Sequence, residues 1–262
     1  MLIATWNVNS LKARLPRVEE WLDQTRPDVV CLQETKLSDK AFPALSFSTL
    51  GYESVHFGQG QWNGVAILSR VGIDEPLYGF AEGIEPDVDA RLIAATCGGV
   101  RVHSVYVPNG REVGHDHYLY KLSWLARLRY HLAATCSPEG DVVVAGDWNI
   151  IPTDIDVWDP SEFIGSTHVT PEERGALDTV KDWGLVDTFR RRYGDDAKGL
   201  FSYYDYTAGH FHKREGMRID YVLSSRPLAE RSILDVIDRN ARKGSKPSDH
   251  APVLAAFAPL AR

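Results

Sequence analysis

Cysteine is scarce in this sequence, and its positions do not suggest a metal site. The 262 residues include three cysteines, Cys31, Cys97 and Cys136, an odd number without the paired spacing of zinc ligands. Cys31 and Cys97 lie within apolar runs. We therefore expect reduced thiols in the core of a cytoplasmic protein rather than the disulfides of a secreted one.

Long apolar runs and linker segments are also missing. No apolar stretch approaches the length of a membrane span. The first residues, MLIATWNVNSLKAR, lack the basic start and apolar stretch of an export signal. No Gly/Ser-rich or Pro-rich tract divides the chain, so we predict a single domain over residues 1–262 with no membrane association.

The chain lacks an excess of positive charge, which excludes one way of binding nucleic acid. A protein that coats nucleic acid needs surplus Lys and Arg, whereas the net charge here is −7. An enzyme that cuts nucleic acid is not excluded. A carboxylate-lined metal site contributes negative charge that its cation offsets.

Short apolar runs dominate what is present, and most of them are typical of buried strands. Strands are predicted at 2–8, 28–32, 62–70, 91–97, 100–107, 141–149, 219–223 and 252–257, and residues 71–86 are expected to form a loop. A helix is predicted with Pro16 in its first turn, a second carries Leu122 to Leu132 on one side, and a third begins at the Thr170–Glu173 capping box. Because helices separate groups of strands, we predict two packed sheets with helices outside.

Polar side chains follow several of these predicted strands. The run 142–145 should stop at Gly146, so that Asp147 and Asn149 project from the strand end. Each such residue alone has an ordinary explanation as a partner of turn backbone groups. The whole set, however, is rich in oxygen ligands, contains one imidazole and no cysteine, and favours Mg²⁺ or Mn²⁺ over zinc. Its members are Asn7, Asn9, Glu34, Tyr106, Asn109, Asp147, Asn149, Asp220, Asp249 and His250.

Six sequence blocks occur in a fixed order between Trp6 and Val253: WNVNS, LQETK, YVPNG, GDWN, MRIDYVL and PSDHAPV. Together they resemble the signature of the exonuclease III class of abasic-site endonucleases, within the endonuclease/exonuclease/phosphatase superfamily. The resemblance implies a DNase I-like four-layer α/β sandwich, a monomer, and Mg²⁺ or possible Mn²⁺ dependence. It also implies incision of double-stranded DNA 5′ to abasic sites to leave a 3′-hydroxyl, with 3′–5′ exonuclease and 3′-phosphatase or phosphodiesterase action on blocked 3′ ends.

The resemblance also implies a metal ligand and a group that activates water. Glu34 would be the principal ligand, with Asn7 and Asp249 near it. Mg²⁺ commonly takes one or two carboxylates and keeps its waters. Asp147 would then remain free to orient and deprotonate the attacking water, with help from Asn149.

Further residues would contact the scissile phosphate. His250, paired with Asp220, would bind it and stabilise the charge that develops there, and Tyr106 would also contact it. An aspartate beside an imidazole favours the protonated form, which can donate hydrogen bonds to a phosphate.

The remaining residues would hold DNA around the site, by the same resemblance. Candidates for contact with DNA or phosphate are Asn9, Lys36, Arg91, Asn109, Arg111 and Arg218. An apolar pocket for the abasic sugar would contain Tyr203, Met217 and Ile219. Solvated surface charge is the ordinary alternative for each Lys and Arg, and a simple core position is the alternative for Met217. Some relatives have tryptophan at the Met217 position, so this pocket could be wider.

Other members of the superfamily are the nearest alternative identities. They include DNase I-like nucleases, phosphoinositide phosphatases and sphingomyelinase-like phosphodiesterases. DNase I-like members use a second catalytic histidine where this chain has Tyr106. A binding protein that had lost catalysis would be expected to have lost part of the polar set, which is intact here.

Overall fold

The computed structural model describes residues 1–259, and within them twelve strands form two six-stranded sheets. The first has the order β11-β12-β1-β2-β4-β3 and the second β5-β6-β7-β8-β10-β9. The strands of the first sheet are β1 (Leu2–Asn7), β2 (Val29–Gln33), β3 (Glu53–Phe57), β4 (Val65–Ser69), β11 (Ser232–Ile237) and β12 (Val253–Phe257). Those of the second are β5 (Asp74–Tyr78), β6 (Leu92–Cys97), β7 (Val100–Tyr106), β8 (Val142–Asp147), β9 (Leu185–Asp187) and β10 (Asp220–Ser225).

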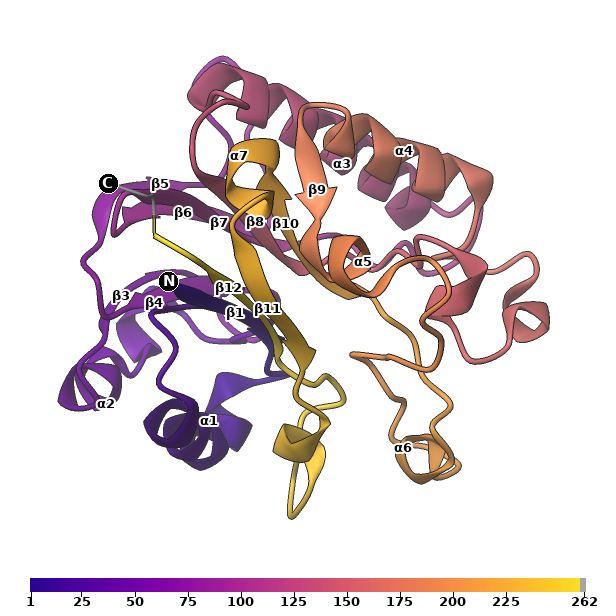
Figure 1. Cartoon of the computed structure of the whole chain (residues 1–262), viewed down its shortest axis with the longest axis horizontal. Helices are drawn as coiled ribbons and strands as arrows, with labels where there is room; N and C mark the ends of the chain where they lie inside the picture. Colours follow the sequence, from indigo (N-terminus) through magenta and orange to yellow (C-terminus); the bar gives the residue numbers. More distant parts are fainter. Residues whose placement is uncertain (260–262) are drawn as a thin grey trace.

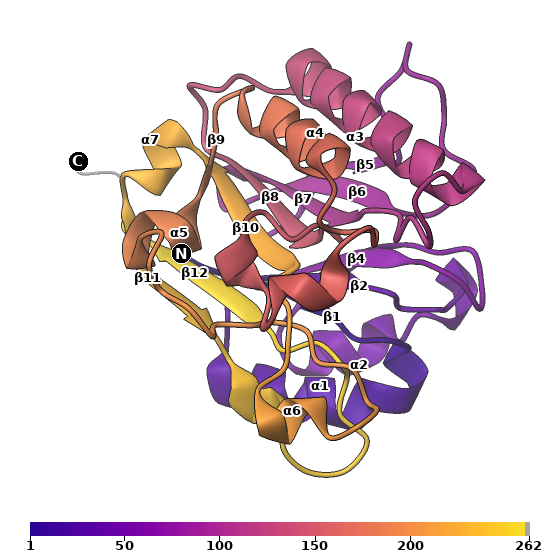
Figure 2. The same cartoon turned by 90° about the vertical axis from the view of Figure 1, so that its right-hand side faces the viewer.

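Helices cover the outer face of each sheet (Figures 1 and 2). The described helices are α1 (Leu11–Thr25), α2 (Ala44–Thr49), α3 (Asp116–Thr135), α4 (Pro171–Lys181), α5 (Thr188–Tyr193), α6 (His210–Lys213) and α7 (Arg226–Ala229). α1 and α2 lie against the first sheet, while α3 and α4 lie against the second. The predicted sandwich of two mixed sheets between helices is confirmed. None of the helices in residues 1–259 is long and apolar enough to cross a membrane.

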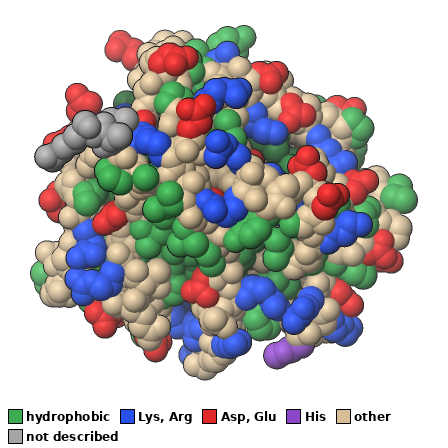
Figure 3. Space-filling view, in the orientation of Figure 1, with side chains coloured by type: hydrophobic (Ala, Val, Ile, Leu, Met, Phe, Trp, Pro, Cys, Tyr) green, Lys and Arg blue, Asp and Glu red, His purple; other side chains and the backbone are tan. Residues whose placement is uncertain are grey.

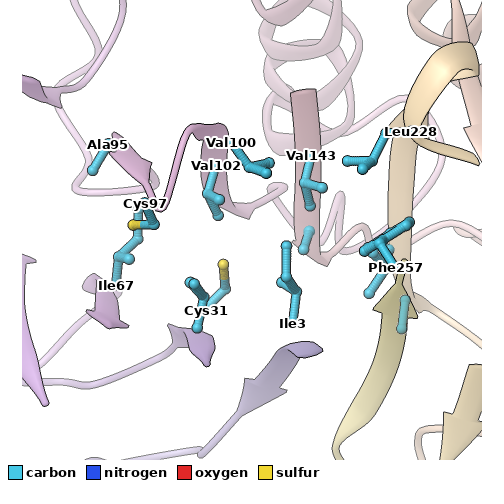
Figure 4. Packing of buried hydrophobic residues seen from close by; sticks show 14 of the residues in the cluster. Ile3, Cys31, Ile67, Ala95, Cys97, Val100, Val102, Val143, Leu228 and Phe257 are labelled. Carbon is cyan, nitrogen blue, oxygen red and sulfur yellow. The ribbon is translucent and has the colours of Figure 1, made fainter. Parts of the chain in front are cut away.

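Alternation along the strands produces three apolar layers. Ile3 and Val143 point between the sheets, as Figure 4 shows, whereas Ala4 and Val144 point toward the helices. Cys31 belongs to the layer between the sheets, where it is fully buried as expected. Because both faces of the central strands are covered, their polar side chains concentrate at the strand ends.

Each sheet contains one parallel pair of strands among the pairings described, and the two pairs are built alike. α1 connects β1 to the parallel β2, and α3 connects β7 to the parallel β8. The other pairings are antiparallel, including that of β1 with β12 near the opposite end of the chain. The crossovers make both strands of a parallel pair end at the same edge of their sheet.

The first helix begins earlier than predicted. α1 starts at Leu11, so that Pro16 lies inside the helix rather than in its first turn. Tertiary contacts explain the difference: Leu11 is fully buried, and the amides of Ser10 and Leu11 donate to the carbonyls of Glu34 and Thr35. These contacts fix the start of the helix although Pro16 lacks an amide for the helical ladder.

The predicted loop at 71–86 contains a strand. β5 lies at the edge of the second sheet, and its pairing with β6 shifts between Asp74 and Leu77. Pro76 falls within this irregularity, where a missing amide is tolerated. Two local predictions are confirmed: β6 and β7 form a hairpin, and Thr170 and Glu173 form the capping box of α4.

The central strand β8 does not break at Gly146, where the sequence predicts that its apolar run stops. Gly146 is not a terminus, because β8 extends through it to Asp147. A Cβ atom at Gly146 would lie 1.9 Å from the backbone oxygen of Val105 and 2.7 Å from its Cγ2. Glycine at this position therefore permits the close approach of β7 and β8 immediately before the polar strand end.

We expect Gly146→Ala to lower the free energy of unfolding by about 3 kcal/mol or more, because backbone must move to admit the methyl group. Urea denaturation followed by circular dichroism would measure the change. The matched control is Gly175→Ala in α4, where no atom lies within 4 Å of an added Cβ. In that variant the free energy of unfolding should increase by about 0.5–1 kcal/mol. Equal stability of Gly146→Ala and the wild type would contradict the close-packing argument.

Candidate active site

Strand ends from both sheets meet at one end of the sandwich, on the right in Figure 1 and toward the viewer in Figure 2. β1 ends at Asn7, and Glu34 follows directly after β2. In the second sheet, strand register places Tyr106 opposite Asp147 and Asp147 opposite Asp220. The pairing of the strands thus assembles residues that are far apart in the sequence.

Asn7 joins the two sheets at this point. Its amide nitrogen donates to Glu34 Oε1 at 2.8 Å and to Asp147 Oδ2 at 2.9 Å, while its oxygen accepts from the amide of Asn9. The side chain is fully buried. A neutral amide that donates to two carboxylates holds them near each other without cancelling the charge of either, because each N–H serves one acceptor.

His250 and Asp220 form a buried pair, as the sequence predicted. His250 Nδ1 lies 2.9 Å from Asp220 Oδ2, and Nε2 lies 3.8 Å from Asp147 Oδ2. Burial alone would lower the pKa of His250, but the carboxylates of Asp220 and Asp147 outweigh it and raise this pKa to about 10. The imidazole is therefore protonated at neutral pH and can donate a hydrogen bond to an anion.

Ser202 is a site residue that the sequence did not reveal. Its hydroxyl donates to Asp220 Oδ2 at 2.6 Å, so that it helps to orient the partner of His250. It also accepts hydrogen bonds from the amides of Ile219 and Asp220. A serine in an aromatic-rich segment has no spacing that links it to position 220, and only the tertiary contact identifies it.

Asp147 has the properties of a proton acceptor. Burial, with the nearby charge of Asp220, raises its pKa to about 7, although His250 opposes this shift. Its Oδ1 accepts the amide of Asn149 at 3.0 Å, and its Oδ2 accepts from Asn7. These bonds fix the orientation of the carboxylate, and its pKa allows proton uptake near neutral pH.

Two asparagines form the wall beside Asp147. Asn109 Nδ2 donates to Asn149 Oδ1 at 3.2 Å, and Asn149 Nδ2 donates to the carbonyl of Val107 at 2.9 Å. The backbone of Asn149 is left-handed, with φ of 51°. The structure thus brings together the asparagines that follow β7 and β8.

Tyr106 is held by an arginine that the sequence assigned to phosphate binding. The guanidinium of Arg91 lies 4.7 Å from the centre of the Tyr106 ring and donates to Asp89 at 2.9 Å. Arg91 is only 7% exposed, so the structure places it behind the tyrosine rather than at an open surface. Burial, with Glu34 nearby, raises the pKa of Tyr106, which keeps its hydroxyl protonated.

Glu34 is the carboxylate most suited to a cation. Its side chain is part-exposed, and Lys36 Nζ lies 2.8 Å from its Oε2, where a positive charge is already accommodated. Burial alone would raise the pKa of Glu34, but Lys36 and Asn7 outweigh it and lower this pKa. Asn9 connects this corner to Asp249 through a 3.2 Å hydrogen bond. The oxygen donors present fit Mg²⁺ or Mn²⁺.

A second cluster also offers closely spaced ligand atoms. Those of Asp147, Asp220 and His250 lie within 4.8 Å of one another. His250 and Asp220 are already hydrogen-bonded to each other, however, so that two of these ligand atoms are already engaged. We therefore favour Glu34, rather than this triad, as the position for a cation.

Two of the three residues predicted for the sugar pocket line the same cavity. Tyr203 and Met217 line a cavity of about 230 Å³ together with Trp158 and Phe163, and the Tyr203 ring lies 5.0 Å from that of His250. Ile219 does not line this cavity, because it is 2% exposed and packs in the core beneath it. Ile219 therefore supports the pocket from below, contrary to prediction.

The predicted contacts with DNA or phosphate separate into two groups. Asn9 and Lys36 lie beside Glu34, with Lys36 Nζ 2.6 Å from Asn9 Oδ1, and Arg111 is exposed. Arg218 is only 1% exposed, and its guanidinium donates to Asp156 at 2.6 Å and to Asp187 at 2.8 Å. The prediction of a phosphate contact for Arg218 is wrong, because the buried carboxylate of Asp156 and the part-buried carboxylate of Asp187 already hold it.

We expect Arg218→Met to lower the free energy of unfolding by about 3–5 kcal/mol, because Asp156 and Asp187 would lose a buried partner. Chemical denaturation would measure this loss. Lys40→Met is the control, since Lys40 is exposed, and it should change stability by less than about 0.5 kcal/mol. If Arg218→Met were as stable as the wild type, the ion pairs would not explain why Arg218 is buried, and Arg218 would again be a candidate for phosphate contact.

Comparisons with known proteins identify the family of this chain. A model described as the Endonuclease/Exonuclease/phosphatase family matches residues 4–250. Exodeoxyribonuclease III of Haemophilus influenzae is 34% identical over 98% of this chain and 100% of its own. An AP endonuclease structure from Archaeoglobus fulgidus has a TM-score of 0.95 at 36% identity, covering 99% of this chain and 100% of that one. A Neisseria 3′ phosphatase bound to a product DNA hairpin has a TM-score of 0.93 at 36% identity, covering 98% and 99%. The chain therefore belongs to the Endonuclease/Exonuclease/phosphatase family.

Proposed function

We propose that this protein is a divalent-metal-dependent DNA repair phosphodiesterase. It cleaves duplex DNA on the 5′ side of abasic sites to leave a 3′-hydroxyl, and it trims nucleotides and blocking groups from 3′ ends. One observation carries the proposal: Oδ2 of Asp147, whose pKa is about 7, lies 3.8 Å from Nε2 of the protonated His250. The site thus combines a proton acceptor with a donor suited to a phosphate.

The chemistry follows from these residues. Asp147 accepts a proton from water while Asn149 helps to orient it, and the water oxygen bonds to phosphorus as the bond to the leaving oxygen breaks. His250 and Tyr106 donate hydrogen bonds to phosphate oxygens, where negative charge increases during attack. Mg²⁺ or Mn²⁺, held by Glu34 with Asn7 and Asp249 nearby, would neutralise part of that charge.

The surroundings of the site support DNA as the substrate. Tyr203, which lines the cavity together with Met217, contacts the ring of His250. The cavity suits a sugar taken out of the helix, which costs little where no base is stacked or paired. Asn9, Lys36, Asn109 and Arg111 lie around the polar strand ends. Figure 3 shows further Lys and Arg side chains near α6 and residues 239–246, along the lower edge of that face. Local positive charge can hold phosphates although the net charge is negative.

The relatives support the range of activities that we propose. Their names include an exodeoxyribonuclease, an AP endonuclease and a 3′ phosphatase, and the structures of the last two share the fold of this chain. We further propose a monomer that acts in the cytoplasm, a location with which three free thiols agree.

Three labelled duplexes test the function: one with a stable abasic analogue, one with a 3′-phosphate and one intact. With Mg²⁺, the wild type should make one cut 5′ to the analogue and remove the 3′-phosphate, and EDTA should stop both reactions. Progressive 3′ shortening alone would make exonuclease action the main activity. If the wild type cleaved none of the three duplexes, the result would contradict the proposal.

In the same assay, we expect Asp147→Asn to lower kcat by about 10²–10⁴-fold, because the amide cannot accept the proton of the attacking water. DNA affinity, measured by fluorescence anisotropy, should stay within a few-fold of the wild type, since the shape of the side chain is kept. A parallel loss of affinity and turnover would instead assign Asp147 a structural role.

We expect Glu34→Gln to raise the Mg²⁺ concentration for half-maximal rate by about tenfold or more, because a charged ligand is lost. Initial rates across a Mg²⁺ titration measure this shift. Glu53→Gln is the control, since Glu53 is exposed on β3, away from the polar strand ends. A titration curve identical to that of the wild type would remove Glu34 as the ligand.

A further inference from the structure

Lys121 on α3 and Glu173 on α4 form an ion pair whose side chains are completely buried. The chemistry proposed above does not use either residue. Taking two charges out of water costs several kcal/mol for each ion, so a buried pair is weak evidence for a role in stability. The groups that the pair contacts indicate a different role.

The ammonium group of Lys121 has three protons, and three acceptors lie around it. They are a carboxylate oxygen of Glu173, the carbonyl of Asn149 at 2.6 Å and the carbonyl of Asn109 at 3.3 Å. The donors of a lysine are thereby fully used. Glu173 is fixed in turn by Thr167 at 2.6 Å and by the hydroxyl of Thr170 at 2.9 Å.

The two carbonyls belong to the asparagines that form the wall beside Asp147. Asn109 follows β7 and Asn149 follows β8, so neither is held by the strand ladder of its sheet. Lys121 donates to the backbone carbonyls of both residues. In their side chains, Nδ2 of Asn109 donates to Oδ1 of Asn149 at 3.2 Å. The backbone amide of Asn149 donates to Asp147 Oδ1 at 3.0 Å. A continuous chain of contacts leads from the buried ammonium to the proposed proton acceptor.

The space around Lys121 is closely filled. A Cβ atom added to Gly110 would lie 3.3 Å from Lys121 Cδ and 2.5 Å from Thr167 Oγ1. The loop after Asn109 therefore packs directly on the lysine stem. The ring of His168 also contacts the carbonyl of Asn149, and the hydroxyl of Thr167 donates to that of Asn109 at 3.2 Å. Lys121, by contrast, donates to both carbonyls and so connects them.

We propose that Lys121 is a positioning residue that fixes Asn109 and Asn149 relative to each other, and through Asn149 fixes the carboxylate of Asp147. Glu173 serves to keep the buried ammonium charged and directed at the two carbonyls. This inference rests on the proposed function, because it assumes that Asp147 and Asn149 act on the attacking water. It predicts that loss of the lysine reduces turnover more than DNA binding, and that turnover stays low when stability is restored.

The experiment compares Lys121→Met with the double variant Lys121→Met/Glu173→Gln. The single variant leaves a carboxylate buried without its partner and should lower the melting temperature markedly. The double variant removes that charge, and glutamine can still complete the capping box of α4. If Lys121 positions the site, the double variant recovers stability but not kcat, which should stay roughly 10- to 100-fold below the wild type. KM and DNA affinity should change little.

A matched control separates positioning from general destabilisation. Leu132→Ala removes fully buried apolar contacts from the same helix, three turns from Lys121. It should lower the melting temperature while kcat at a permissive temperature stays near that of the wild type. A comparable fall of kcat in Leu132→Ala would show that weakening α3 alone impairs turnover, and would overturn the proposal.

One further outcome would also overturn it. Wild-type kcat in a stable double variant would show that Lys121 is not needed to position Asn109 and Asn149, and that the ion pair acts only on folding. Failure of the proposed function is recognised separately, because the wild-type protein itself would then leave all DNA substrates uncut.

Discussion

The candidate site depends on the two hydrogen bonds that Asn7 donates to Glu34 and Asp147. These two carboxylates come from different sheets, and their like charges would repel each other in a buried environment. The neutral amide lets them stay close while they keep different properties: Glu34 has a lowered pKa beside Lys36, and Asp147 a raised one. One site thus contains a permanent anion suited to a cation and a carboxyl group able to take up a proton.

Much of the fold could be predicted from sequence because the central strands are covered on both faces and read as apolar runs. The polar residues that follow these strands include most of those in the candidate site, and the resemblance implied a role for them. β3 and β11, by contrast, were not recognised, since partly exposed faces at the sheet edges interrupt their apolar patterns. β5 carries Pro76 and was taken for a loop.

Interactions between distant side chains could not be predicted. Arg218 follows a motif residue and looked available for phosphate, but Asp156 and Asp187 hold it, and neither has a spacing that reveals the contact. Lys121 is one polar residue on a helix with an apolar side, and its partner Glu173 was noticed only as a cap. Such pairs depend on how helices and loops pack, which local patterns do not determine.

The antiparallel pairing of β1 with β12 affects how the protein is made. Trp6 donates a hydrogen bond to the backbone of His250, 244 residues away, so the first strand is completed by a segment that is synthesised much later. Contacts of such long sequence separation form slowly in folding. A nascent chain on the ribosome therefore contains Glu34 and Asp147 before His250 has been synthesised. Hydrolytic competence should appear only after the segment that contains His250 has been synthesised.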